Sequence, residues 1–191
     1  MKAELIRKGI HSLIALTPWL ADMNRSHTAL FLMGGVFFYA FAEGLRFVGF
    51  SPPFTSSVTK SVLREREKGR FALGPVTLGL GALLAIILFP PQAAAAGIYA
   101  LAFGDSAATL TGKFLGRIRP AFMAGKSLEG SLACFAVATL ACFLVFQDWK
   151  IAIATGIVSM VVELFPVRDF DNLLLPLAVG FTATVAAFVF L

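Results

Sequence analysis

The stretch LAFGDSAATLTGKFLGRIRPAFMAGKSLEGS, residues 101–131, decides how the rest of the chain is interpreted. Its aspartate, Asp105, interrupts an apolar run, and the connector that follows is rich in glycine and contains four cations but no acid. A carboxylate at the end of a membrane helix that faces a loop of Lys, Arg and Gly suits a metal-bound polyphosphate. The carboxylate would hold Mg²⁺, and the cations and glycine N–H groups would take the phosphate oxygens.

The composition points to lipid, not water, as the solvent of this chain. Apolar residues make up 58% of the 191 residues, 20 residues are phenylalanine, and only 14% are charged; the mean hydropathy is +0.84. These values lie far outside those of soluble proteins. The net charge of +5 therefore indicates anionic headgroups or phosphorylated substrates and not nucleic acid. Neither zinc-ligand spacing nor an aromatic and basic strand pattern is found.

The two cysteines, Cys134 and Cys142, lie eight residues apart in one apolar run. On a helix this spacing is about 12 Å, which is too far for a disulfide. We interpret both as packing residues.

Seven apolar runs predict an all-α, polytopic membrane protein with about seven transmembrane helices in a single catalytic domain, residues 1–191. The runs are Ile10–Ala21, Thr28–Phe50, Phe71–Phe89, Ala93–Gly112, Leu128–Phe146, Ile151–Val162 and Leu173–Leu191. Pro90-Pro91 predicts a tight external turn. The polar segment Ser51–Arg70 is interpreted as a solvated linker, with a cytoplasmic interfacial helix as the alternative.

The distribution of cations predicts a cytoplasmic N-terminus. With seven spans in this orientation, only Arg25 and Lys150 of the 16 lysines and arginines fall outside, as the positive-inside rule requires. We therefore expect an integral protein of the cytoplasmic (inner) membrane. The same orientation brings every charged candidate to the cytoplasmic face: His11, Glu43, Asp105, Lys113, Lys126, Glu129, Glu163, Asp169 and Asp171.

Several of these residues allow both a structural and a functional interpretation. Arg7, Lys8 and His11 share one side of a helix, which favours a membrane-surface anchor with an interfacial histidine. Glu43 and Arg46 are three apart and able to pair, with a function equally open. An acid inside a span is costly and usually functional, so Asp105 is interpreted as functional.

The later polar residues also allow two interpretations. Lys126 and Glu129 stand at the start of an apolar run, where they could form a capping ion pair. Asp171 or Asn172 could be the N-cap of the last span or, for Asp171, a metal ligand.

The sequence resembles one known family in four places. These are RKxxH at 7–11, GDSAATLTGKFLGR at 104–117, KSLEGSLA at 126–133, and an acid followed by Pro and by Asp-Asn over 163–172. They resemble the CTP-dependent lipid-alcohol kinases, which act on dolichol, polyprenol, phytol or diacylglycerol and are related to the phosphatidate cytidylyltransferases. The resemblance implies Mg²⁺-dependent transfer of the γ-phosphoryl group of CTP to a lipid alcohol.

The resemblance also implies roles for individual residues. Asp105 matches the acid of the family's G-D-[SA]-A signature, and residues 126–130 match its K-S-x-E-G signature. The implied metal ligands are Asp105, Glu163 and Asp171. The implied catalytic residues are His11, Asp105, Lys126 and Glu129, with His11 and Glu129 as candidates for the proton acceptor. The implied nucleotide-binding residues are Arg7, Lys8, Gly112, Lys113, Arg117, Ser127 and Gly130.

Other nucleotide-binding motifs are missing from the sequence. Pro120 stands where a Walker glycine would precede Gly125–Ser127, and Gly112-Lys113 is followed by Phe114 in place of Ser or Thr. A protein-kinase glycine loop is missing as well.

Other functions stay open on sequence alone. A cytidylyltransferase would use the same CTP and metal but release pyrophosphate. A small transporter or membrane scaffold is the alternative from a different class. The expected partners are a lipid alcohol, a nucleoside triphosphate (CTP, with ATP open) and membrane lipids, and a homodimer is also open.

Overall fold

The computed structural model describes residues 2–50, 71–123, 125–165, 167 and 170–190, without the side chains of residues 2–6 and 122. Over these residues the chain is helical and contains no strand, which confirms the all-α prediction. The elements in chain order are α1 (Lys2–Ser12), η1 (Leu13–Leu16), α2 (Thr17–Met23), α3 (Arg25–Phe47), α5 (Gly74–Leu88), α6 (Pro91–Tyr99), η3 (Ala100–Asp105), α7 (Ser106–Phe114), η4 (Ala121–Met123), α8 (Leu128–Phe146), α9 (Trp149–Leu164) and α10 (Asp171–Phe190).

Four helical segments are long and apolar enough to cross a membrane. They are Arg25–Phe47, Pro91–Phe114, Leu128–Phe146 and Asp171–Phe190. Pro91–Phe114 is one continuous rod, made of α6, the π-helical η3 and α7. By length and composition these four agree with the predicted spans, while the seven-span count and the cytoplasmic N-terminus stay predictions.

Side-chain caps explain where the predicted helix boundaries shift. α3 begins at Arg25, three residues before the predicted start, because the Asn24 side chain accepts a hydrogen bond from His27 N at 2.9 Å. α9 begins two residues before its predicted start, because Asp148 Oδ1 accepts from Lys150 N and Ile151 N at 2.7 and 3.1 Å. The bounds of α8 agree with the predicted span.

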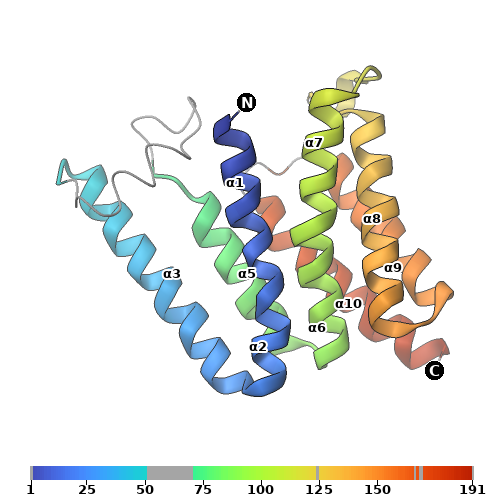
Figure 1. The fold of residues 1–191 in the computed structure, drawn as a ribbon, viewed down its shortest axis with the longest axis horizontal. Helices are drawn as coiled ribbons and strands as arrows, with labels where there is room; N and C mark the ends of the chain where they lie inside the picture. Colours follow the sequence, from blue (N-terminus) through green and yellow to red (C-terminus); the bar gives the residue numbers. More distant parts are fainter. Residues whose placement is uncertain (1, 51–70, 124, 166, 168–169, 191) are drawn as a thin grey trace.

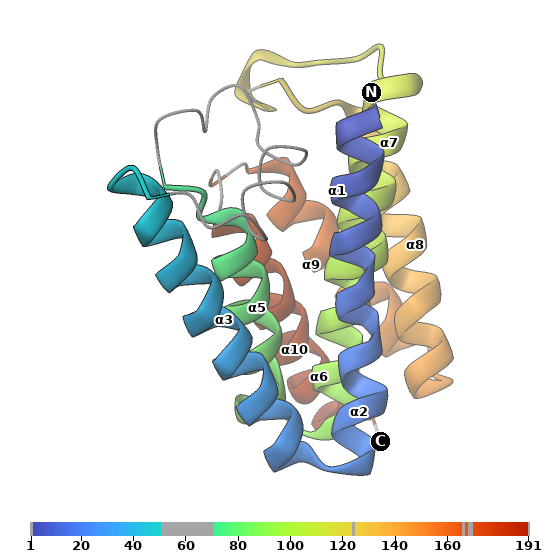
Figure 2. The same cartoon turned by 60° about the vertical axis from the view of Figure 1, so that its left-hand side comes forward.

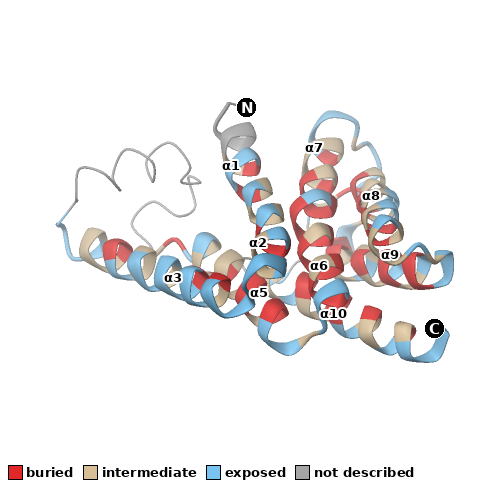
Figure 3. Cartoon of the chain, turned by 60° about the horizontal axis from the view of Figure 1, so that its bottom comes forward, coloured by how far each residue is buried: buried red, intermediate tan, exposed pale blue. Residues whose placement is uncertain are grey.

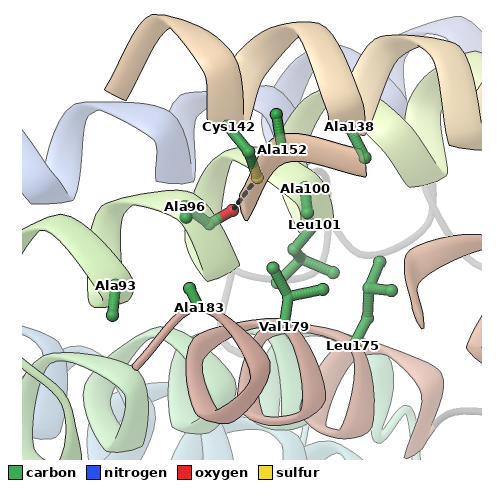
Figure 4. Close-up of a cluster of buried hydrophobic side chains, with 10 residues drawn as sticks. All are labelled: Ala93, Ala96, Ala100, Leu101, Ala138, Cys142, Ala152, Leu175, Val179 and Ala183. Atoms are coloured by element: carbon green, nitrogen blue, oxygen red, sulfur yellow. Dashed lines mark hydrogen bonds between the residues drawn. The ribbon is translucent and has the colours of Figure 1, made fainter. Parts of the chain in front are cut away.

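The core lies where α6 and η3 pack against α8, α9 and α10, and small side chains fill it (Figure 4). Its buried members are Ala93, Ala96, Ala100, Leu101, Ala138, Cys142, Ala152, Leu175, Val179 and Ala183. Small residues let helix backbones approach closely, which is how helices associate in lipid. Both cysteines are buried and free, which confirms their assignment as packing residues.

α3 is the least enclosed of the four spanning segments. It packs against α5 and meets α2 near its start, but it leans away from α1 further along (Figures 1 and 2). Its outer face is largely exposed (Figure 3) and carries Phe31, Phe37, Phe38 and Phe41. Exposed aromatic and aliphatic side chains along a span are suited to contact with lipid.

The two ends of the bundle hold different connections. The N-terminus and the α7–α8 loop (residues 115–127) lie at one end, which we call the charged end (Figure 2). The C-terminus lies at the other, which we call the opposite end, together with the α5–α6 and α8–α9 turns (Figure 1). The α5–α6 turn consists of Phe89 and Pro90, so the predicted tight turn is present there.

Candidate functional site

Asp105 occupies an unusual position in the middle of a spanning rod. It is the last residue of the π-helical segment Ala100–Asp105, and it is only 7% exposed. A π-helical turn inserts one residue into an α-helix and occurs frequently at functional sites. A buried carboxylate needs compensating charge or hydrogen bonds, so its neighbours decide what it can do.

α1 supplies two of those neighbours. Lys8 Nζ forms an ion pair with Asp105 Oδ2 and lies 3.4 Å from the Asp105 carbonyl oxygen. His11 Nε2 lies 3.3 Å from Asp105 Oδ2 and 3.3 Å from Leu101 O. Both side chains are buried. The anchor interpretation with an interfacial histidine is therefore wrong, because Lys8 and His11 face Asp105 inside the bundle.

A second ion pair lies beside the first. Lys126, from the α7–α8 loop, places Nζ 2.9 Å from Oε1 of Glu163, in the last turn of α9. Lys126 and Glu163 are close enough to Asp105 to interact with it electrostatically. We call Lys8, His11, Asp105, Lys126 and Glu163 the charged cluster. Four separate parts of the chain thus meet in one buried polar site.

Asp171 stands at the edge of the charged cluster. It begins α10, and its Oδ1 accepts a hydrogen bond from Asn172 N at 3.0 Å. It interacts electrostatically with Asp105 and Lys126. The neighbouring Asn172 has a structural contact, since its side-chain nitrogen donates to Gly74 O of α5 at 3.2 Å.

Glu129 does not take part in the charged cluster. Its Oε1 accepts from Arg117 N at 2.9 Å and from Ile118 N at 3.1 Å. Lys126 pairs with Glu163, so the alternative of a Lys126–Glu129 capping pair is wrong. Glu129 instead holds the first residues of the α7–α8 loop against the start of α8.

The other signature residues form the junction between α7 and α8. Ser127 is the N-cap of α8, with Oγ accepting from Gly130 N at 3.1 Å. A Cβ on Gly130 would lie 2.7 Å from Ala108 O, and one on Gly112 would lie 3.0 Å from Ser127 Oγ. All three residues therefore have a structural role here, and their nucleotide contacts stay a prediction.

Arg119 completes the α7–α8 loop, and sequence reasoning did not select it. Its guanidinium donates to the carbonyl oxygens of Gly112 and Gly125. It thereby closes the C-terminal end of α7, where a cation is favourable. No sequence signal distinguishes Arg119 from its neighbour Arg117. The loop that presents Lys126 is thus fastened at both of its ends.

The remaining predicted phosphate-binding cations lie outside the charged cluster. Lys113 and Arg117 have exposed side chains, and Arg7 is partly buried beside Lys8. Arg7 also interacts electrostatically with His11. The role of these three cations in nucleotide binding stays a prediction.

The donor set fits a magnesium ion only together with a polyphosphate. Among the described residues, no three His, Cys, Asp or Glu side chains are grouped as a metal site. Asp105 and Glu163 each have a lysine partner. Mg²⁺ typically takes one or two carboxylates and completes its shell with water and substrate phosphates. Asp105 and Glu163 supply two carboxylates of this kind, and no group of three is found among the described residues.

The predicted Glu43–Arg46 pair is confirmed and is structural. Arg46 donates to the Glu43 carboxylate from Nε at 2.8 Å and from Nη2 at 2.6 Å. The same carboxylate accepts from Ala72 N at 2.7 Å. Residues 51–70 and Asp169 lie outside the described residues, so the predictions for them stay open.

Comparison with known proteins gives three relatives. The chain is 33% identical over 132 residues to an uncharacterised protein of Methanocaldococcus jannaschii, covering 68% of this chain and 65% of that protein. It is 29% identical over 147 residues (74% and 45%) to CTP-dependent diacylglycerol kinase 1 of Eremothecium gossypii. It is 26% identical over 157 residues (74% and 66%) to CTP-dependent diacylglycerol kinase 1 of Schizosaccharomyces pombe.

The matched region spans less than two thirds of each relative's length. No protein-family profile matches the chain. No solved structure matches it either.

Proposed function

We propose that this chain is a CTP-dependent kinase that phosphorylates the hydroxyl group of a membrane lipid alcohol. The observation that carries the proposal is Asp105, a carboxylate buried in a spanning rod and surrounded by Lys8, His11 and the Lys126–Glu163 pair. Similarity to two CTP-dependent diacylglycerol kinases supports the nucleotide and the lipid class.

Phosphoryl transfer requires mainly positioning and neutralisation of charge. The bond between the γ-phosphorus and the β–γ bridging oxygen breaks, a bond from the γ-phosphorus to the lipid oxygen forms, and CDP leaves. Lys8 and Lys126 would bind the phosphate oxygens. Of the two candidate proton acceptors, His11 faces the charged cluster and Glu129 faces the loop backbone. We therefore assign the hydroxyl proton to His11 and the shaping of the loop to Glu129.

Asp105 and Glu163 would hold Mg²⁺ in this site. The ion would neutralise the negative charge that the phosphate oxygens carry during transfer. Without substrate, Lys8 and Lys126 neutralise the two carboxylates. With substrate, Lys8 and Lys126 would bind phosphate oxygens, and Asp105 and Glu163 would be available to hold the ion. Buried charge is compensated in both states, which limits the large cost of an unpaired buried ion.

The proposal requires the charged end to face the cytoplasm, where CTP is found. This orientation can be tested with single cysteines at Lys113 and Asp148, since the first side chain is exposed, the second is partly exposed, and the two lie at different ends. A membrane-impermeant maleimide should label position 148 in intact cells and position 113 only after the cells are opened. Labelling of position 113 in intact cells would contradict a cytoplasmic site.

The reaction is tested with purified protein in lipid nanodiscs. The protein is incubated with Mg²⁺, γ-labelled CTP or ATP, and diacylglycerol, a polyprenol or phytol. We expect labelled lipid phosphate and CDP, with Asp105→Asn as the inactive control. If phosphatidate and CTP give a CDP-lipid and pyrophosphate, the protein is a cytidylyltransferase. If no nucleotide is consumed with any of these lipids, the kinase proposal is wrong.

A further inference from the structure

An apolar groove lies on the side of the bundle where α3 leans away from α1. Its walls come from η1, α3 and α5 and include Ile14, Leu32, Gly35, Tyr39, Leu78 and Gly79. Apart from Tyr39, every residue that lines it is apolar. The groove lies along the Arg25–Phe47 span, so it opens at the depth of the hydrocarbon.

We propose that this groove holds the hydrocarbon chain of the lipid alcohol while its hydroxyl group reaches the charged cluster. This inference rests on the proposed kinase function. The groove and the charged cluster share a wall: Ile14 follows His11 by three residues on one continuous helical rod. His11 contacts Asp105, and Ile14 lines the groove and packs against the buried cluster around Leu32 and Ile98. The groove therefore reaches to within about one helical turn of His11.

The groove would fix the position of the lipid chain more than it would raise the affinity for the lipid. A lipid chain that moves from the bilayer into an apolar groove leaves one apolar surrounding for another, so the hydrophobic effect contributes little. Fixing the chain, however, limits where the hydroxyl group can lie relative to the phosphate, and orientation has a large effect on transfer rates. The groove residues would thus determine how efficiently a long-chain alcohol is used.

Two adjacent glycines of α3 provide a matched pair of variants. A Cβ built on Gly35, which lines the groove, meets no atom within 4 Å, and the same holds for Gly34, which does not line it. Leucine at either position adds similar bulk to the same exposed helix and raises helix propensity equally. Only Gly35→Leu puts that bulk in the groove.

The kinetic test compares Gly35→Leu, Gly34→Leu and wild type in mixed micelles, with the lipid alcohol that wild type phosphorylates best. We expect Gly35→Leu to lower kcat/KM for the lipid about tenfold or more, because the hydroxyl group loses its fixed position. The KM for CTP should not change, and Gly34→Leu should match wild type. Equal kcat/KM values for the two variants would overturn the proposal.

A binding test does not depend on turnover. A diacylglycerol and a polyprenol, each with a diazirine in its chain, are photolysed in nanodiscs with the protein, and labelled peptides are mapped. We expect one probe to label groove residues, with labelling prevented by Gly35→Leu and by unlabelled lipid alcohol, but not by phosphatidylcholine. If the groove is labelled in this way but the protein has no kinase activity, the groove binds the lipid chain and the proposed kinase function is wrong.

The other outcomes reject the groove. If phosphatidylcholine competes as well as the alcohol does, the groove holds only bulk lipid. If labelling is spread evenly over the outer surface of a protein that has kinase activity, the function stands and the groove proposal falls.

Discussion

The two ends of the bundle satisfy their polar groups in different ways. At the opposite end, polar side chains bind nearby backbone: Asn24 and Asp148 cap helices, and Arg25 donates to carbonyl oxygens at the end of α5, including Phe89 O at 2.9 Å. Toward the charged end, Ser127, Glu129 and Arg119 also bind nearby backbone. In addition, Lys8 pairs with Asp105 and Lys126 pairs with Glu163, each across separate elements.

This difference separates groups that hold the fold from groups that are available to a ligand. A cap satisfies backbone groups that would otherwise be exposed at a helix end, so releasing it costs stability. A buried ion pair contributes little net stability, because desolvation offsets the attraction. The charged cluster is therefore hard to explain by stability alone, which supports assigning it to chemistry.

The largest expected effect is at Asp105. Asp105→Asn should lower turnover at least about 100-fold, the scale on which single groups that stabilise transition-state charge act. It should also lower the melting temperature, because Lys8 loses its buried partner. Turnover is measured with labelled CTP, and melting in detergent.

The double variant Asp105→Asn/Lys8→Gln separates the two effects. We expect it to recover the melting temperature, since no buried cation is left unpaired, but not the activity. Normal turnover in Asp105→Asn would assign Asp105 a purely structural role.

The second-largest effect is expected at Lys126, a cation of the charged end, and Arg25 of the opposite end is its control. Lys126→Gln should raise the KM for CTP about 10- to 150-fold, because a charge-assisted contact is worth roughly 1.5–3 kcal/mol. Arg25→Gln should leave that KM unchanged. Steady-state kinetics on both variants checks this, and equal increases would remove the distinction between the ends.

A smaller effect is expected at Glu129. Two substitutions distinguish a role in holding the loop backbone from a direct contact with metal or phosphate. Glu129→Gln keeps an acceptor for Arg117 N and Ile118 N and should change kcat/KM by only about threefold, or ~0.7 kcal/mol. Glu129→Ala leaves both N–H groups without that partner and should cost roughly tenfold, or more. Hydrogen exchange over residues 115–127 should be faster in the alanine variant alone. A glutamine variant as inactive as alanine would instead indicate a direct contact with metal or phosphate.

The smallest effect on activity is expected at Arg25. Arg25→Gln should lower the free energy of unfolding by about 1 kcal/mol, because the cation at the end of α5 is lost. Its turnover should match wild type. His27→Gln, which changes an exposed side chain of the same helix, α3, is the control and should melt like wild type. Loss of turnover in Arg25→Gln would show that the opposite end also affects the reaction.

The sequence predicted those features that depend on local pattern. Hydropathy located the helices, and the bounds of α8 agree with the prediction because Ser127 is a clear N-cap before an apolar run. Asp105 was recognisable because an acid in an apolar run is costly. The Glu43–Arg46 pair followed from a spacing of three residues.

The contacts across the bundle were not predictable in the same way. Lys8 and Asp105 are 97 residues apart, and no periodicity connects them. Lys126 pairs with Glu163 although Glu129 is closer in sequence, because Glu129 is used by the loop backbone. Gly112 and Gly130 resembled phosphate-binding glycines, yet their lack of a Cβ serves the approach of α7 to α8.

The π-helical segment Ala100–Asp105 has a consequence for insertions and deletions. Its extra residue rotates α7 by about 100° relative to α6 about the shared axis, because an α-helix has 3.6 residues per turn. Deleting Phe103, which is 42% exposed, would remove little buried surface but would turn one half of the rod against the other. If α6 kept its packing on α10, the carboxylate of Asp105 would then point away from Lys8. Length in this segment is thus constrained more tightly than residue identity, and we expect substitutions at position 103 to be tolerated where a deletion is not.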